Sequence, residues 1–173
     1  MNIVVYNGSP HPKGNTAALL NAFVKGAKEA GNRVDVVNLA HMRIDGCLGC
    51  DYCVRQGREG NCLKKDEMRD VYPLLEKADA LVIATPIYYF TWTAQTHAAL
   101  QRCYAFGKPP KLQKMALLLS SYSPDVYDGS IATYRDICGY WEVEDMGIVT
   151  AYGEQNKSDA KVEEAYALGA SFK

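Results

Sequence analysis

The sequence predicts an α/β fold in which a doubly wound parallel sheet of five strands carries helices on both faces. Apolar runs without polar alternation recur along the chain, as expected for strands that are buried on both faces. Segments with apolar residues at helical spacing alternate with these runs. The chain has 173 residues, of which 48% are hydrophobic and 23% charged, which suits one globular domain over residues 1–173. Right-handed crossovers then leave few possible topologies.

The expected elements alternate along the whole chain. The first strand covers Ile3 to Tyr6, and a helix with apolar residues at three- and four-residue steps runs from Asn15 or Thr16 to about Gly31. The other strands are predicted at residues 33–39, 80–85, 115–120 and 147–151. The other helices are predicted at residues 66–78, where Pro73 should limit or bend the helix, and at residues 93–105, 131–140 and 159–171.

The loop after the first strand is the strongest functional signal. Gly8 and Gly14 allow backbone conformations and close approaches that a Cβ would block. Side-chain donors are available from Ser9, Asn15 and Thr16, and positive charge from His11 and Lys13. A strand that leads through such a loop into a helix places unpaired backbone N–H groups at the carboxyl edge of the sheet, where they attract phosphate.

Three other phosphate-binding motifs are excluded by spacing and composition. A P-loop has four residues between its glycines and a Lys after the second, whereas five residues separate Gly8 from Gly14 and Asn15 follows. The dinucleotide fingerprint G-x-G-x-x-G is absent. The loop has no Cys, which excludes a cysteine phosphatase.

The sequence GSPHPKGNT at residues 8–16 resembles the GSPR-x-x-GNT loop of the flavodoxin-like NAD(P)H-dependent FMN reductases and their relatives, the iron-sulfur flavoproteins. The resemblance continues through CLGCDYC, NCLKKDEM and TPIYYFTWTAQ. It implies a flavodoxin-like sheet, FMN as cofactor and NAD(P)H as electron donor. The chain departs from the family pattern at His11, where the family commonly has Arg, so a permanent charge is lost.

The cofactor site is expected where the loops after the first, third and fourth strands converge. In the family, the segment that matches residues 86–90 contacts the flavin ring, and its aromatic side chains and N–H groups suit a flat ring. Trp92 and one of the two tyrosines suit the core or a subunit interface as well as flavin contact. The expected cofactor-binding residues are Ser9, His11, Gly14, Asn15, Thr16, Pro86, Ile87, Tyr88, Tyr89, Phe90 and Ser121.

No catalytic residue is assigned, because hydride transfer between stacked rings demands no general acid or base. His41 and His97 are expected to be surface or packing residues.

An insertion at about residues 40–65 is too long for a plain connection and holds most of the cysteines. The thiols of Cys47, Cys50, Cys53 and Cys62 could bind a [4Fe–4S] cluster, as in the iron-sulfur flavoproteins, although the last spacing is longer than in those proteins. Structural zinc, free thiols and a disulfide remain alternatives. The two remaining cysteines, Cys103 and Cys138, fall in helical segments and are expected in the core.

The resemblance and the loops predict an enzyme in which FMN takes hydride from NAD(P)H and passes electrons to flavin, quinone or another small acceptor. The alternative is an iron-sulfur flavoprotein that relays electrons between a ferredoxin-like partner and FMN. A homodimer or homotetramer is expected, because family members commonly build the flavin site at a subunit interface. A simple flavodoxin-like carrier is less consistent with the insertion and the net charge of −1.

The charge pattern argues against two classes of partner. With a formal net charge of −1 and no Lys/Arg cluster, the chain offers no electrostatic footprint for nucleic acid or for an anionic membrane. The chain begins directly in a strand, without a basic segment followed by an apolar one, so a cytoplasmic location is expected.

Overall fold

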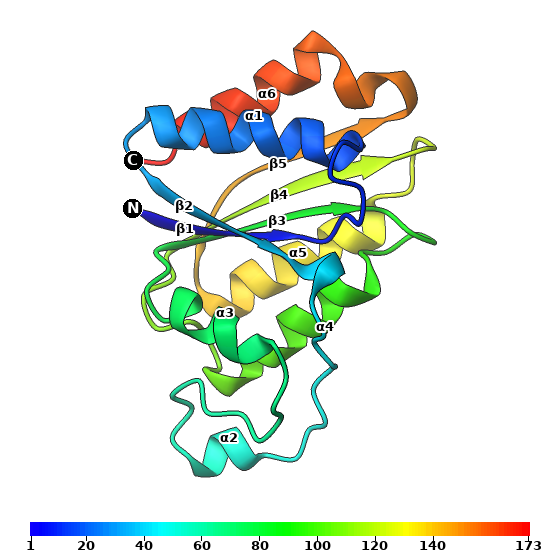
Figure 1. The fold of residues 1–173 in the computed structure, drawn as a ribbon. Helices are drawn as coiled ribbons and strands as arrows, with labels where there is room; N and C mark the ends of the chain where they lie inside the picture. The colour runs from blue at the N-terminus through cyan, green and yellow to red at the C-terminus, as the bar shows by residue number, and fades with distance from the viewer.

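The computed structural model describes all residues from 1 to 173 and stacks helices, sheet and helices in layers (Figure 1). The five strands are all parallel and lie in the order β2-β1-β3-β4-β5. Their bounds are β1 Asn2–Asn7, β2 Arg33–Asn38, β3 Ala80–Pro86, β4 Lys114–Ser121 and β5 Glu144–Tyr152. The predicted doubly wound, flavodoxin-like α/β fold is therefore confirmed.

Helices cover both faces of the sheet, as Figure 1 shows. On one face lie α1 (Asn15–Glu29) and α6 (Asp159–Ala170); on the other lie α3 (Met68–Leu75), α4 (Ala94–Arg102) and α5 (Asp128–Trp141). Three short 3₁₀ turns are η1 (Leu39–His41), η2 (Cys103–Ala105) and η3 (Gly153–Lys157). Helix α3 is shorter than predicted and contains Pro73 inside it.

Alternate residues of the central strands pack into two separate cores. In β1, Ile3 and Val5 contact the core beneath α1 and α6, whereas Val4 and Tyr6 belong to the core beneath α3, α4 and α5. Successive side chains of a strand point to opposite faces of the sheet, and here both faces are apolar. This two-sided burial explains why the strands lack polar alternation.

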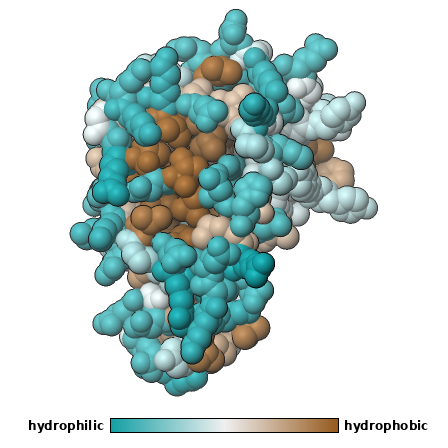
Figure 2. Space-filling view, viewed as in Figure 1, coloured by the Kyte–Doolittle hydropathy of each residue, from teal (hydrophilic) through white to brown (hydrophobic).

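The edge strand β2 is less covered than its neighbours. Figure 2 shows hydrophobic side chains gathered over this strand, where Val36 is 38% exposed. No helix of the structure combines the length and the apolar character needed to cross a lipid bilayer.

Helices α1 and α6 approach each other through one glycine in each helix. A Cβ on Gly26 would lie 2.1 Å from the carbonyl oxygen of Tyr166, and a Cβ on Gly169 would lie 2.1 Å from that of Phe23. Neither contact can be relieved by a side-chain rotation, because the obstructing atoms are backbone.

We expect Gly169→Ala to lower the free energy of unfolding by about 1–3 kcal/mol, as overpacked cores do, because the helices must separate. Chemical denaturation measures the change. Gly139→Ala is the control, since a Cβ there meets nothing within 4 Å, and Ala is the better helix former. If the Gly169→Ala variant were as stable as the Gly139→Ala variant, α1 and α6 could not approach each other as closely as described.

The cysteine insertion is closed at its base by a buried ion pair. The guanidinium of Arg102, which is 1% exposed, donates to both carboxylate oxygens of Asp66 and, over 3.1 Å, to the carbonyl oxygen of Asp45. The N–H of Asp45 donates to Asp66 Oδ2 over 3.1 Å. Both ends of the segment 46–65 are thus held on the end of α4. Within it lies one short helix that was not predicted, α2 (Tyr52–Arg55).

Candidate flavin site

A cavity of about 290 Å³ lies at the carboxyl edge of the sheet. The loops after β1, β3 and β4 all contribute to it, as expected for a ligand site in a doubly wound sheet. Its lining residues are Ser9, His11, Gly14, Asn15, Thr16, Pro86, Ile87, Tyr88, Ser120, Ser121 and Tyr122. All of these except Ser120 and Tyr122 were predicted as cofactor-binding residues.

The phosphate loop ends at the amino terminus of α1. Gly14 is the N-cap residue, no side chain caps the helix, and its first turn contains no acidic residue. The N–H of Ala18 donates to the carbonyl of Gly14, which leaves the N–H groups of Asn15, Thr16 and Ala17 without an acceptor within the helix. These donors and the positive end of the helix dipole suit the phosphate of FMN.

A turn between His11 and Gly14 shapes the loop. The N–H of Gly14 donates to the carbonyl of His11 over 3.0 Å. A Cβ on Gly14 would lie 2.8 Å from the Cβ of His11, so this close approach requires glycine.

Asn7, a residue that the sequence reasoning missed, holds the start of the loop. Its Oδ1 accepts the N–H of Ser9 over 3.1 Å, and its Nδ2 donates to Asn38 over 2.9 Å. Ser9 Oγ in turn accepts the N–H of His11 over 3.2 Å. The signal for Asn7 was available, because a side chain of this type at the end of a buried strand commonly bonds the backbone two residues on.

Two hydrogen bonds connect the loops across the cavity. The hydroxyls of Thr16 and Ser120 lie 2.7 Å apart. The N–H of Ile87 donates to the carbonyl of Ser120 over 2.8 Å. Ser120 therefore joins the phosphate loop, the end of β3 and the end of β4.

Ser121, at the end of β4, is fixed by its own hydrogen bonds. Its hydroxyl lies 2.7 Å from the carbonyl oxygen of Ser123 and 2.6 Å from the hydroxyl of Tyr127. The Tyr127 hydroxyl donates to the carbonyl of Ala151 over 2.8 Å, and burial raises its pKa.

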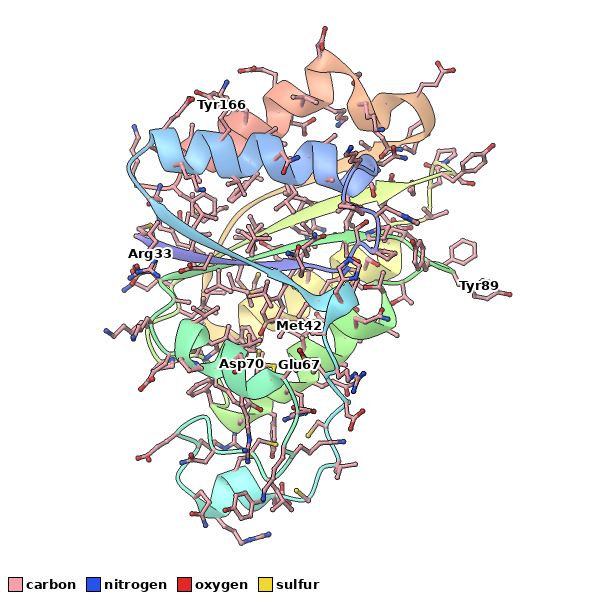
Figure 3. All side chains as sticks on the ribbon, in the orientation of Figure 1. Arg33, Met42, Glu67, Asp70, Tyr89 and Tyr166 are labelled. Carbon is pink, nitrogen blue, oxygen red and sulfur yellow. The ribbon has the colours of Figure 1, made fainter.

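Tyr89 and Phe90 lie outside the cavity, at the tip of a tight turn. Backbone bonds in both directions join Tyr88 to Thr91. The two residues between them have φ angles of 54° and 67°, the left-handed conformation that this turn requires. Their side chains are 96% and 65% exposed, and Figure 3 shows Tyr89 projecting from the body of the protein. Neither side chain lines the cavity, and their contact with the flavin ring stays a prediction.

Trp92 belongs to the core, since it is 1% exposed. Its indole stacks on the ring of His97, with 5.4 Å between the centroids. His97 Nε2 lies 2.8 Å from the hydroxyl oxygen of Thr91, and burial lowers the pKa of the imidazole. His97 thus packs against Trp92, which agrees with the surface or packing position predicted for it.

A second cavity, of about 910 Å³, adjoins the first and shares Tyr88 with it. It is lined by Trp92, His97, Gln95 and Gln101 and by small or apolar residues, with Asp45 as its one charged side chain. No Lys or Arg lines this cavity.

The sequence matches the model of the family described as NADPH-dependent FMN reductase over residues 1–151. The chain belongs to this family. As a member of the NADPH-dependent FMN reductase family it is an FMN-dependent oxidoreductase. The family match confirms the predicted enzyme class and FMN as the cofactor.

The sequence is also similar to curated iron-sulfur flavoproteins. An iron-sulfur flavoprotein of Archaeoglobus fulgidus is 28% identical over 166 residues, which cover 88% of this chain and 69% of the relative. Matches to other iron-sulfur flavoproteins span about half of their length, between 42% and 56%.

Two solved structures show the same fold. An NAD(P)H:quinone oxidoreductase from Methanothermobacter marburgensis has a TM-score of 0.73 at 19% identity, over 99% of this chain and 94% of that one. A flavodoxin from the domain Archaea has a TM-score of 0.62 at 14% identity, over 97% and 92% of the two chains.

The four cysteines of the insertion in this FMN reductase family member differ in exposure. Cys47 and Cys50 are exposed, Cys62 is half-buried and Cys53 is buried. Burial raises the pKa of the Cys53 thiol, and the nearby sulfurs of Cys62 and Cys47 raise it further. The structure nevertheless contains no group of three or more His, Cys, Asp or Glu side chains that could hold a metal ion.

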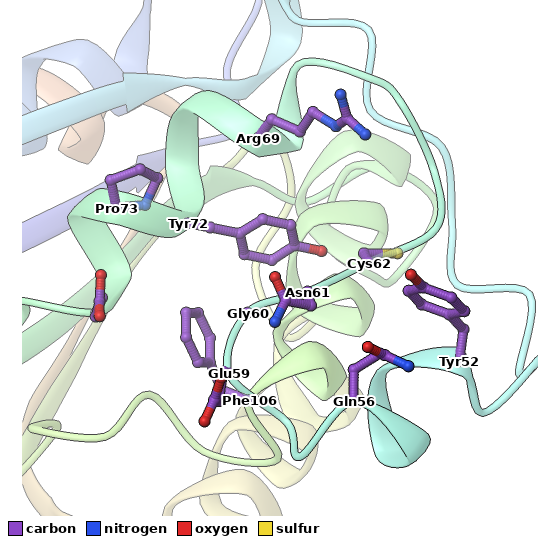
Figure 4. A pocket seen from close by; sticks show the side chains of 11 residues that line it. Tyr52, Gln56, Glu59, Gly60, Asn61, Cys62, Arg69, Tyr72, Pro73 and Phe106 are labelled. Atoms are coloured by element: carbon purple, nitrogen blue, oxygen red, sulfur yellow. The ribbon is translucent and has the colours of Figure 1, made fainter.

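Cys62 also lines a separate cavity of about 550 Å³ on the insertion, together with Tyr52, Arg69 and Tyr72 (Figure 4). The two cysteines outside the insertion, Cys103 and Cys138, are buried as predicted. Burial raises the pKa of the Cys103 thiol to about 11, so that it is un-ionised at neutral pH.

Proposed function

We propose that the protein binds FMN in the cavity between the loops after β1, β3 and β4, takes hydride from NADH or NADPH, and passes electrons to a small acceptor. One observation carries the proposal: an uncapped helix terminus and the ends of two neighbouring strands surround one cavity. Bound FMN would supply the hydride chemistry.

The residues of the chain would bind and orient the cofactor. The N–H groups of residues 15–17 and the hydroxyls of Ser9 and Thr16 would hold the phosphate. Tyr88 would form a wall beside the ring. The hydrogen bonds of Ser120 to Thr16 and to Ile87 would keep these groups at a fixed spacing.

We assign the acceptor to the second cavity, which adjoins the first at Tyr88. The phosphates of a nicotinamide dinucleotide favour cationic side chains, and this cavity offers none and contains Asp45. Its aromatic and uncharged hydrogen-bonding groups suit a flat, uncharged acceptor such as a quinone.

The test of this function is anaerobic stopped-flow mixing of the FMN-loaded protein with NADH or NADPH. We expect the flavin absorbance to bleach with at least one of the two nucleotides. Bound FMN that neither nucleotide reduces would contradict the proposal.

We expect Ala98→Phe, which fills part of the second cavity, to raise KM for a quinone by about tenfold, because lost shape complementarity costs on the order of 1.4 kcal/mol. Steady-state kinetics with a benzoquinone measure the change. Reduction of FMN by the nucleotide should stay as in the wild type. An unchanged KM for the quinone would show that the acceptor does not bind in this cavity.

A second candidate function is electron relay through a [4Fe–4S] cluster to a ferredoxin-like partner. It is favoured by the names of the relatives and by the four thiols of the insertion. The thiols do not form a metal-binding group as they are folded here, and we derive no step through a cluster. Iron and sulfide analysis of protein purified without oxygen separates the two functions, since only the second requires iron.

We further propose a homodimer or homotetramer. Tyr89 and Tyr122, which are 96% and 92% exposed beside the flavin cavity, would be covered by a second copy. Sedimentation of the FMN-loaded protein as a monomer would contradict this.

A further inference from the structure

The turn η3 follows the last strand, beyond the part of the chain that the family model matches. It nevertheless contacts two of the loops that form the flavin cavity. One contact is made by Asn156, the other by Lys157.

Asn156 fixes the position of the turn. Its side chain is 1% exposed, and Nδ2 donates to the carbonyl of Ser121 over 2.8 Å and to that of Gly153 over 2.9 Å. The first bond joins the turn to the end of β4, where Ser121 lines the cavity. A buried amide with two such bonds leaves its neighbour in the chain little freedom to move.

Lys157, the next residue, reaches the phosphate loop. Its ammonium group donates to the carbonyl of Lys13 over 3.4 Å, although 144 residues separate the two in sequence. Lys13 directly precedes Gly14, the N-cap of α1. A positive charge that no acidic side chain pairs is therefore held beside the helix terminus that would receive a phosphate.

Within the loop itself, one side chain, that of Lys13, carries a full positive charge, and Lys157 would add a second from outside the loop. No carboxylate forms a salt bridge with His11. Backbone N–H groups carry only partial charges. A phosphate with a charge near −2 would gain from a full cation nearby.

We propose that Lys157 is a cofactor-binding residue that stabilises the FMN phosphate by its charge, and that Asn156 positions it. The inference rests on the proposed FMN site. The inference concerns only the phosphate end of the cofactor, so removal of the Lys157 charge should leave binding of the ring and the ribityl chain unchanged.

The test is titration of the apoprotein with FMN and, separately, with riboflavin, which lacks the phosphate. Quenching of flavin fluorescence reports binding of both. We expect Lys157→Gln to raise the Kd for FMN about three- to tenfold, the range for a charge at a helix terminus, and to leave the Kd for riboflavin unchanged. Lys157→Glu should have a larger effect of the same kind. Added salt should weaken FMN binding less in both variants than in the wild type, because one screened attraction is missing.

Lys161→Gln is the matched control. Lys161 lies four residues further along the chain, in α6, and its ammonium group pairs with Glu164 over 2.7 Å. Its removal should change neither Kd. In the wild-type protein, Asn156→Ala should raise the Kd for FMN more than the Kd for riboflavin. In a protein that already carries Lys157→Gln, Asn156→Ala should not increase this difference between the two flavins any further.

The outcomes separate this proposal from the FMN site itself. If the wild type binds neither flavin, the proposed function fails and the role of Lys157 fails with it. If the wild type binds FMN and Lys157→Gln binds it equally well, or loses FMN and riboflavin in the same proportion, only the role of Lys157 is overturned.

Discussion

Replacing Gly14 by Val is expected to weaken FMN binding by at least about 100-fold, equivalent to about 2.7 kcal/mol. A Cβ at this position would lie 2.8 Å from the Cβ of His11 and 3.2 Å from its carbonyl oxygen. The turn from His11 to Gly14 would have to open, which would displace the N–H groups at the start of α1 that are proposed to hold the phosphate. Calorimetric titration of the apoprotein with FMN measures the effect.

The fold should survive this substitution, because Gly14 is a half-buried residue at the start of α1 and belongs to neither core. Far-UV circular dichroism of the variant should match that of the wild type. Gly139→Ala, in an open position of α5, should bind FMN normally. Wild-type affinity in a folded Gly14→Val protein would mean that the phosphate lies elsewhere.

Replacing Asp66 by Asn is expected to lower the free energy of unfolding by about 3 to 5 kcal/mol, the cost of leaving a buried charge without its partner. Arg102 is 1% exposed and loses the carboxylate that accepts from both of its terminal nitrogens. The insertion should loosen with it, because Asp66 also accepts the N–H of Asp45. Chemical denaturation gives the stability, and hydrogen exchange of residues 46–65 reports the loosening.

Two comparisons test the cause of this loss. Glu164→Gln, which breaks the exposed pair with Lys161, should cost no more than about 1 kcal/mol. The double variant Asp66→Leu with Arg102→Met should be more stable than Asp66→Asn, since no charge is left buried. Equal stability of the Asp66→Asn and Glu164→Gln variants would show that the buried pair does not hold the insertion.

The same pair gives stability a dependence on pH. Burial alone would raise the pKa of the Asp66 carboxyl, but the hydrogen bonds and charge of Arg102 and the N–H groups of Asp45 and Met68 lower it overall. A carboxyl whose pKa is lower in the folded state contributes stability above its unfolded pKa and loses it as the pH falls through the folded one. The wild type should therefore lose more stability on acidification than Asp66→Asn does.

The strands and helices were predictable because each depends on the pattern of apolar residues within its own segment of the sequence. The run from Ile3 to Tyr6 is apolar since both faces of β1 are covered, and the spacing that begins near Asn15 reflects the one buried face of α1. The loops of the cavity were predictable because the carboxyl ends of adjacent parallel strands meet at one edge of the sheet.

What escaped prediction depends on contacts between distant residues. Nothing near Asn156 in the sequence indicates that its amide bonds Ser121, or that Lys157 reaches Lys13. Tyr89 and Phe90 point outward because both have a left-handed backbone conformation. Aromatic residues rarely adopt this conformation, so the sequence did not indicate it. Arginine is usually found at the protein surface, and Arg102 is buried only because it forms an ion pair with Asp66.

The most direct test of the proposed FMN site is titration of the apoprotein with FMN and with riboflavin, in which flavin fluorescence reports binding. We expect saturation at one FMN per chain with a Kd below about 1 μM, and weaker binding of riboflavin by roughly 100-fold or more, because the phosphate would be held at the helix terminus. No binding of FMN, or equal affinity for the two flavins, would contradict it.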